Sequence, residues 1–224
     1  MRSTAVVHPR TMTAPDSHAC VVAIDDDPDF LSSVGRLLRS VGLHPQLFTS
    51  VADFLASERP DAPTCLILDV RLPGRSGLDF QRDLAAASAC LPIVFITGHG
   101  DIPMSVQAMK AGAVEFLTKP FRDQDLLDAV NVGLERDRKR RSNDEDLDAL
   151  RVRVDVLTSR ERTILIQVVS GRLNKQIAGD LGITETTVKV HRSNMMHKVK
   201  VSSLAELCRM ADKLKLVPEK PEPR

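Results

Sequence analysis

Residues 64–77 read Thr64-Cys-Leu-Ile-Leu-Asp69-Val-Arg71-Leu-Pro-Gly-Arg-Ser-Gly77, and this stretch decides the fold. The run from Cys65 to Leu68 is apolar without polar alternation, which is typical of a strand buried on both faces of a parallel sheet. It ends on one carboxylate, Asp69, and the Pro-Gly pair that follows indicates a loop. Ligands of open α/β sheets bind at the carboxyl ends of strands. An isolated aspartate at this position more often ends a strand or starts a turn than takes part in chemistry. The residues at the other strand ends therefore determine whether Asp69 belongs to a functional site.

The same order of a buried strand followed by a helix repeats through the first half of the chain. Asp27 and Pro28 favour an N-cap and a first helical residue directly after one strand. Asp101 and Pro103 open a later helix in the same way, and Asp123 is expected to cap the last helix of this half. Five strand-helix units predict a doubly wound parallel α/β sheet. Its strands are expected at residues 20–24, around 47–48, 64–69, 92–97 and 114–119.

Four of these strand ends carry side chains that suit one chemistry. Parallel strands place Asp25 and Asp26, Asp69, Thr97 and Lys119 on one edge of the sheet. Clustered carboxylates repel each other, and a hard divalent cation such as Mg²⁺ relieves that repulsion. A lysine and a hydroxyl beside the cluster suit a phosphoryl group, and a carboxylate can attack phosphorus to form an acyl phosphate.

The charge distribution indicates a second domain with a different partner. The net charge is only +1, but nine Lys and Arg oppose fifteen Asp and Glu from Cys20 to Leu134, whereas eleven oppose five from Leu157 to Val217. The charges balance in 135–156, which we interpret as a charged, partly helical linker whose charged side chains face solvent. An acidic half joined to a basic half is consistent with nucleic-acid binding by the basic one.

Neither end of the chain predicts a membrane or secretory segment. The first nineteen residues have no apolar core, so 1–19 is interpreted as a disordered tail, and the proline-rich 217–224 as a C-terminal tail. No apolar run approaches the ~18 residues of a membrane helix. The four cysteines show no metal spacing and are interpreted as reduced thiols of a cytoplasmic protein.

The second half has the pattern of a helix-turn-helix. Thr158 or Ser159 caps a first helix, with Glu161 placed for a capping box. A short second helix at 174–181 is followed by Gly182 and a third helix that Thr184 caps. The third helix has a buried stripe formed by Val188, by His191 or Met195, and by Val199. Its opposite face carries side chains that reach phosphates and base edges of DNA, namely Thr187, Lys189, Arg192 and Asn194. A small protein-binding domain is the alternative interpretation.

Residues 20–134 resemble the receiver domain of two-component response regulators, and Ile96-Thr-Gly-His-Gly-Asp-Ile-Pro-Met104 resembles the FixJ branch. The resemblance implies that Asp69 is the phospho-acceptor, with Thr97 and Lys119 completing the site. It implies Mg²⁺ ligands in Asp26, Asp69 and the backbone carbonyl of Arg71, with Asp25 acting mainly through water. The switch aromatic falls on Phe116, which has no hydroxyl to donate.

Residues 157–216 resemble the LuxR-type DNA-binding domain, a four-helix all-α fold. The matching motifs are Leu157-Thr-Ser-Arg-Glu161, Asn174-Lys-Gln-Ile-Ala178 and Thr187-Val-Lys-Val-His191. The resemblance implies DNA contacts at Lys175, Thr187, Lys189, His191 and Arg192. It also implies dimerisation through a fourth helix with an apolar face of Leu204, Leu207, Ala211 and Leu214. The sequence departs from the family at Ser202-Ser203, where Asn-Arg is common.

Together the two resemblances imply a transcription factor, not an enzyme. A sensor histidine kinase would phosphorylate Asp69, the protein would form a homodimer, and the dimer would bind promoter DNA and contact RNA polymerase, as an activator. Two alternatives stay open. Asp25-Asp26-Asp27 contains the Asp-x-Asp of haloacid-dehalogenase-type phosphatases, although no cap insertion or second acidic pair follows. A degenerate receiver would instead serve as a constitutive interaction module.

Overall fold

The computed structural model describes residues 19–87, 89–98 and 100–216. The chain forms two compact units, divided between Arg141 and Ser142. The predicted tails lie outside the described residues, apart from Ala19, which is buried in the core of the first unit instead of belonging to a tail. Among the described helices, none combines the length and the apolar composition that a membrane crossing requires.

The first unit contains the predicted five-stranded parallel sheet, in the order β2-β1-β3-β6-β7. The fold class expected from the sequence is therefore confirmed. All residues of β1, β3 and β6 are buried, as their continuous apolar runs predicted. The strands are β1 (Cys20–Ile24), β2 (His44–Phe48), β3 (Thr64–Asp69), β6 (Ile93–Thr97) and β7 (Glu115–Thr118).

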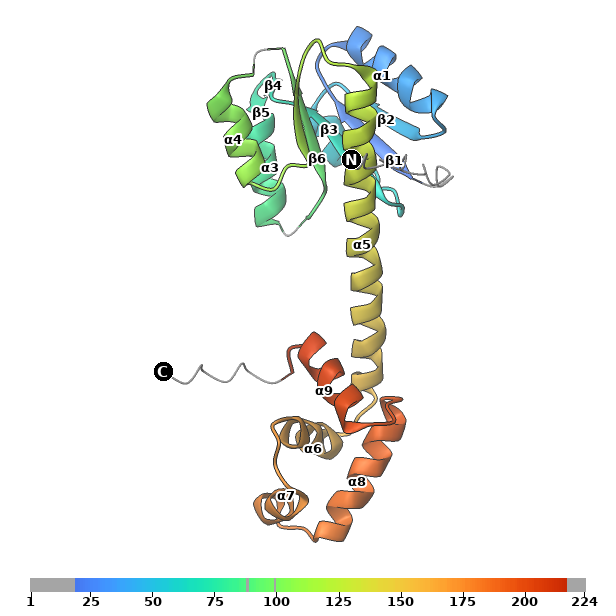
Figure 1. Ribbon diagram of the computed structural model, residues 1–224, viewed down its shortest axis with the longest axis vertical. Helices are drawn as coiled ribbons and strands as arrows, with labels where there is room; N and C mark the ends of the chain where they lie inside the picture. The colour runs from blue at the N-terminus through green and yellow to red at the C-terminus, as the bar shows by residue number, and fades with distance from the viewer. Residues whose placement is uncertain (1–18, 88, 99, 217–224) are drawn as a thin grey trace, which may run out of the picture. The chain divides into compact units, whose positions relative to one another are not determined.

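Helices cover both faces of this sheet (Figure 1). On one face α1 (Pro28–Ser40) and the first turns of α5 (Asp123–Asp155) pack on one set of alternate strand residues. On the other face lie α2 (Val51–Ala56), α3 (Gly77–Ala86) and α4 (Ile102–Lys110). The predicted N-caps Asp27 and Asp101 accept backbone N–H hydrogen bonds at the starts of α1 and α4.

Two local features differ from the sequence prediction. The loop after Asp69 contains a small antiparallel pair, β4 (Arg71–Leu72) with β5 (Arg75–Ser76), closed by a turn at Pro73 and Gly74. The pair is only two residues long on each side, which leaves no periodicity to detect. Asp123 was expected to cap a helix, but it is the first residue of α5.

The charged stretch after Leu134 is helical, and its start is anchored to the sheet. Asp137 in α5 is only 1% exposed. Its Oδ2 accepts a 2.9 Å hydrogen bond from the backbone N–H of Thr64. Arg140 and Arg141 donate to the same carboxylate at 2.8 and 3.2 Å. We expected a solvated face here, but a paired buried carboxylate ties residues 137–141 to the beginning of β3.

The second unit is all-α. Its helices are α6 (Ser159–Val169), α7 (Asn174–Leu181), α8 (Glu185–Lys198) and α9 (Leu204–Lys213). Thr158, rather than Ser159, caps α6 and forms a capping box with Glu161. Gly182, with φ of 63°, ends α7 in the left-handed conformation and begins the tight turn to α8. The last turns of α5 contribute Leu150 and Val154 to the same core.

The burial of individual side chains shows which of the predicted residues form the apolar stripes of α8 and α9. Val188, Met195 and Val199 are fully buried, whereas His191 is only partly buried, so Met195 fills the position left open between them. In α9, Leu207 and Ala211 are buried in the core of the domain. The two side chains are therefore occupied within the monomer, and a dimer contact through them would require the core to open.

Candidate functional site

Three aspartates gather at the carboxyl edge of the sheet, as the sequence predicted. Asp25 follows β1 and Asp69 ends β3, and these neighbouring strands pair with Ile24 opposite Leu68. Asp25, Asp26 and Asp69 each offer a carboxylate oxygen, and these oxygens lie within 4.8 Å of one another. Asp25 and Asp69 are buried, at 2% and 8% exposed, while Asp26 is exposed.

Local backbone hydrogen bonds fix two of these carboxylates. The N–H of Asp27 donates to Asp25 Oδ1, and the N–H of Arg71 donates to Asp69 Oδ1, both at 2.9 Å. Each carboxylate is therefore held by the amide two residues further on, in the turn that follows its strand. In each of these two carboxylates the other oxygen, Oδ2, faces the space between Asp25 and Asp69. Arg71 begins β4, and its carbonyl remains a predicted ligand.

Lys119 lies within reach of both buried carboxylates. Its Nζ is 2.6 Å from Asp25 Oδ2 and 3.6 Å from Asp69 Oδ2. The backbone N–H of Lys119 donates to the carbonyl of Thr97 at 2.8 Å, directly after the pair that joins Thr97 to Thr118. This register places the lysine and the buried threonine at the ends of adjacent strands.

The electrostatics of Asp69 suit a cation ligand. Burial raises the pKa of the Asp69 carboxyl, and the neighbouring Asp25 carboxylate adds to the rise. The N–H of Arg71 and the Lys119 ammonium act in the opposite direction. Three hard oxygen donors on two strand ends, two of them buried, form the donor set that Mg²⁺ prefers. The acidic pocket therefore fits the divalent cation that receiver domains generally bind there.

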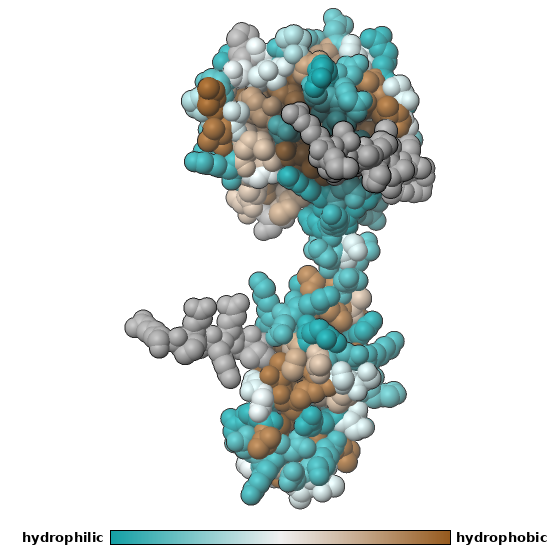
Figure 2. Space-filling view, viewed as in Figure 1, coloured by the Kyte–Doolittle hydropathy of each residue, from teal (hydrophilic) through white to brown (hydrophobic). Residues whose placement is uncertain are grey.

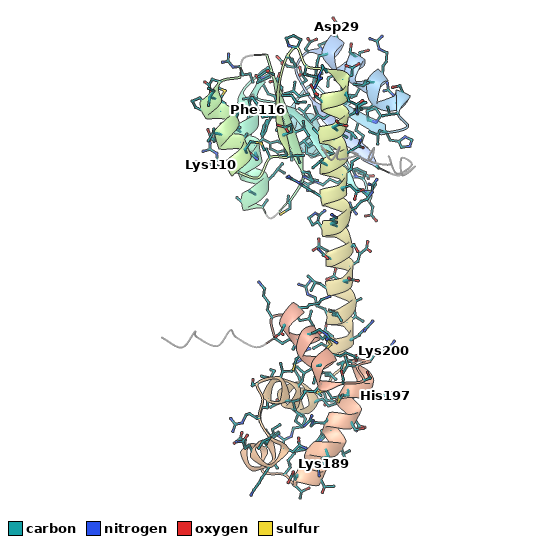
Figure 3. The ribbon with its side chains drawn as sticks, in the orientation of Figure 1. Asp29, Lys110, Phe116, Lys189, His197 and Lys200 are labelled. Carbon is teal, nitrogen blue, oxygen red and sulfur yellow. The ribbon has the colours of Figure 1, made fainter. Side chains whose placement is uncertain are left out.

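Phe116 lies next to this edge, on β7 (Figure 3). Its partly buried ring contacts Phe95, with ring centroids 6.2 Å apart. Gly100, in the loop after β6, is close to the same ring: a Cβ built on Gly100 would lie 2.8 Å from Phe116 Cε1 and 3.0 Å from Thr97 Cγ2. The glycine thus allows this loop to approach both predicted switch residues.

The residues predicted to contact DNA lie on the helix-turn-helix of the second unit. Lys175 on α7 and Lys189 on α8 are exposed, and Figure 3 labels Lys189 toward one end of α8, with His197 and Lys200 at the other. Thr187, His191 and Arg192 are partly buried. Thr187 Oγ1 lies 2.8 Å from the hydroxyl of Thr184, the N-cap of α8. Lys175 and Arg192 also line a shallow groove of about 460 Å³.

A side chain that the sequence analysis missed orients one of these residues. Arg192 Nη1 donates a 2.6 Å hydrogen bond to Asn174 Oδ1, which joins α8 to the first residue of α7. Asn174 begins the matching motif Asn174-Lys-Gln-Ile-Ala178, so the sequence signal was present, but the motif alone did not indicate a contact with Arg192. Val190 on α8 is 54% exposed and was not singled out from the sequence.

A partly buried ion pair joins the C-terminal end of α8 to the beginning of α6. Glu161 is 4% exposed and accepts hydrogen bonds from Lys198 Nζ at 2.8 Å and from the backbone N–H of Thr158 at 2.8 Å. The Lys198 hydrogen bond is the main cause that lowers the pKa of the Glu161 carboxyl. The same carboxylate therefore caps α6 and fixes the C-terminal turn of α8.

Comparison with known proteins identifies the families of both domains. Residues 21–131 match the response regulator receiver domain, and residues 155–211 match the bacterial regulatory proteins of the luxR family. Nodulation protein W of Bradyrhizobium diazoefficiens is 49% identical over 90% of this chain and 89% of its own. The chain belongs to the two-component response regulators. The transcriptional regulatory protein FixJ of Rhizobium meliloti is 39% identical, over 84% of this response regulator and 92% of its own chain.

Solved structures of response regulators resemble it as well. The response regulator StyR is 48% identical, with a TM-score of 0.76 over 88% of this chain and 99% of its own. Full-length FixJ from B. japonicum is 34% identical, with a TM-score of 0.52. The protein is accordingly a transcriptional response regulator and not an enzyme. Its receiver domain implies a histidine kinase as partner, and its luxR-family domain implies DNA binding.

Proposed function

We propose that this response regulator is switched by phosphorylation of Asp69 and that the phosphorylated dimer activates transcription. The observation that carries the proposal is the arrangement around Asp69, where a buried carboxylate has two acidic neighbours and the Lys119 ammonium 3.6 Å away. Burying clustered carboxylates carries a desolvation cost, so their presence here favours a functional role over a purely structural one. The arrangement favours a phosphorylation site over a degenerate receiver.

The chemistry is a phosphoryl transfer from a histidine of the sensor kinase. A carboxylate oxygen of Asp69 attacks phosphorus, a P–O bond forms, and the P–N bond to the kinase histidine breaks. Asp25, Asp26, Asp69 and the carbonyl of Arg71 would hold Mg²⁺, which when bound offsets the charge of the carboxylates and of the phosphoryl oxygens. Lys119 neutralises a further phosphoryl oxygen, and the Thr97 hydroxyl donates a hydrogen bond to another.

The switch follows from the new charge at Asp69. Thr97 and Lys119 move toward the phosphoryl oxygens, and Phe116 turns into the space that Thr97 leaves. Gly100, in the loop before α4, lies close to the side chains of both Thr97 and Phe116. A movement of these two side chains would therefore displace the loop, which supports a coupling between the site and α4. Phosphorylation shifts an equilibrium between two arrangements of α4 and β7 that both exist beforehand.

The surface of α4 suits the dimer contact. Ile102, Val106 and Met109 are 79%, 44% and 43% exposed and share one face of the helix, and Figure 2 shows hydrophobic residues over α4. A row of exposed apolar side chains at helical spacing is typical of a protein-protein contact. Leu204 on α9, 48% exposed, offers a second contact between the DNA-binding domains. Leu214 packs against the core of the DNA-binding domain. Together with the buried Leu207 and Ala211, it holds α9 against the rest of its own domain.

Dimerisation controls promoter binding through effective concentration. Two linked helix-turn-helix domains bind paired half-sites far more tightly than one domain alone. In each domain Lys175, Thr187, Lys189, His191 and Arg192 contact phosphates and base edges. The bound dimer contacts RNA polymerase and acts as an activator in the cytoplasm, where its DNA lies.

Acetyl phosphate tests the switch without a kinase. Wild-type protein with Mg²⁺ and acetyl phosphate should gain one phosphoryl group by mass spectrometry, become dimeric in sedimentation, and bind promoter DNA more tightly. Asp69→Asn should do none of these, whereas Asp128→Asn, which changes an exposed carboxylate on α5, should behave as wild type. Undiminished DNA binding without any adduct would instead favour a constitutive interaction module.

Ile102→Glu separates phosphorylation from dimerisation. The variant should gain the phosphoryl group at the wild-type rate but remain monomeric, because a charge on each copy would face its counterpart. If Ile102→Glu still dimerises on phosphorylation, the α4 surface is not the contact.

A further inference from the structure

The Lys119 ammonium has a third neighbour that belongs neither to the acidic site nor to the family motif. Its Nζ lies 3.7 Å from the centroid of the Phe30 ring, on α1. A cation this close to the face of an aromatic ring is attracted by the negative face of the ring. The ammonium therefore contacts the Phe30 ring as well as the carboxylates of Asp25 and Asp69.

The sequence fixes the ring in this place. Asp27, the N-cap of α1, accepts a 3.2 Å hydrogen bond from the backbone N–H of Phe30. The same Asp27 donates its own N–H to Asp25, so the ring and the acidic pair belong to one turn. Phe121, two residues after Lys119, meets the Phe30 ring edge-on with centroids 6.2 Å apart and an interplanar angle of 85°. The ring is thus supported from α1 and from the loop before α5.

A lysine side chain has four rotatable bonds, so its ammonium must be restrained if it is to act at a fixed point. Lys119 is 25% exposed and borders a surface groove that Phe30 and Phe121 also line, so water can reach it from that side. The ring covers the ammonium without adding a formal negative charge. A further carboxylate would compete with the incoming phosphoryl oxygens for Lys119, whereas a ring face competes weakly.

We propose that Phe30 is a positioning residue for phosphoryl transfer, which keeps the Lys119 ammonium beside Asp69 before the phosphoryl group arrives. The inference rests on the proposed phosphorylation of Asp69. A cation-π contact of this strength, if it acts wholly on the barrier to phosphoryl transfer, corresponds to a change in rate of roughly two- to thirtyfold. Phe30→Leu should therefore slow phosphorylation by a factor in that range, while Phe30→Tyr, which keeps the ring, should restore it.

The rate of phosphorylation by acetyl phosphate in the presence of Mg²⁺ is the first measurement, made on the full chain by mass spectrometry. A small phosphoryl donor is used in place of the sensor kinase because Phe30 borders a surface groove. A substitution there would also change how a kinase docks, and the rate would then change for a reason unrelated to Lys119. Leu37→Ala is the matched control, since it loosens the packing of the same helix and lines the same groove but has no part in the contact with Lys119. It should phosphorylate within about twofold of wild type. Equal slowing by Phe30→Leu and Leu37→Ala would mean that loosened packing of α1, not the ring over the ammonium, is responsible.

The second measurement does not depend on phosphorylation. In the NMR spectrum, the ε-methylene protons of Lys119 should be shifted upfield by the ring current in wild type and Phe30→Tyr, and not in Phe30→Leu. If wild type shows the shift but takes up no phosphoryl group, the proposed function fails and the contact stands. If wild type is phosphorylated and Phe30→Leu matches its rate, the positioning role is overturned. Should Phe30→Leu not fold, Phe30→Met removes the ring with a more adaptable side chain and takes its place in both measurements.

Discussion

Asp137→Asn tests whether the helix beyond the sheet belongs structurally to the receiver. The Asp137 carboxylate is 1% exposed and accepts from the Thr64 backbone N–H and from the side chains of Arg140 and Arg141. Asparagine keeps the shape but replaces one oxygen by an NH₂ donor. At least one of the three donor groups then faces another donor instead of an acceptor.

The expected loss of stability follows from these contacts. A buried backbone N–H without an acceptor costs about 1–3 kcal/mol. The two arginines are 38% and 28% exposed and remain solvated, so losing each ion pair adds at most about 1 kcal/mol. We expect the free energy of unfolding of the receiver to fall by about 2–4 kcal/mol. For a unit of this size the midpoint of thermal unfolding should fall by roughly 6–12 °C.

Calorimetry is the suitable assay, because the chain has no Trp and no Tyr for fluorescence. Hydrogen exchange of the Thr64 amide locates the effect, since that N–H donates directly to Asp137. The matched control is Asp128→Asn on the same helix, where an exposed carboxylate oxygen accepts from Gln124 and an amide oxygen can replace it. If Asp137→Asn shifts neither the transition nor the exchange more than Asp128→Asn does, the anchoring role of Asp137 is refuted.

Three further predictions concern other parts of the chain. Because hydrogen bonds hold the pKa of Glu161 below its ordinary value, its contribution to stability is present at neutral pH and is lost as pH falls through that lowered pKa. Urea unfolding should therefore show Glu161→Gln less stable than wild type at pH 7, with the difference shrinking between about pH 5 and pH 3. Lys189→Ala should reduce the slope of log affinity for DNA against log salt by about 1, measured by fluorescence anisotropy of labelled DNA, whereas Lys213→Ala on α9 should leave the slope unchanged. Gly77→Ala would place a Cβ 2.3 Å from the carbonyl oxygen of Asp69 and should cost about 1–3 kcal/mol in thermal unfolding, while Gly98→Ala, with open space around it, should be tolerated.

The strand ends could be predicted from the sequence because the signals there are local and strong. A continuous apolar run followed by a polar residue marks both the strand and its end, and parallel pairing then brings Asp25, Asp69, Thr97 and Lys119 to one edge. The helix caps were predictable for the same reason, since Asp27 and Thr184 act within three residues of themselves. No long-range information was needed.

Contacts between distant segments were harder to predict. Asp137 was interpreted as part of a solvated charge run, although it continues the helical face of Val130 and Leu134 at spacings of seven and three. Composition concealed the periodicity, because a buried aspartate looks like its exposed neighbours until its partner Thr64 is known. The ring of Phe30 over Lys119 joins residues 89 positions apart in the same way. For α9 the pattern was correct, but an apolar face alone does not say whether the domain core or a second copy covers it.

The position of β7 at the end of the sheet limits how two receivers can associate. An edge strand can recruit a strand from another molecule through its open backbone groups, and repeated recruitment produces fibres. Here the edge is only four residues long, Glu115 places a charge at its beginning, and Pro120, which has no N–H, follows shortly after its end. Continuous backbone pairing between copies is thereby disfavoured. The proposed dimer on this side would therefore rest on side-chain contacts, which favour closed pairs over open fibres.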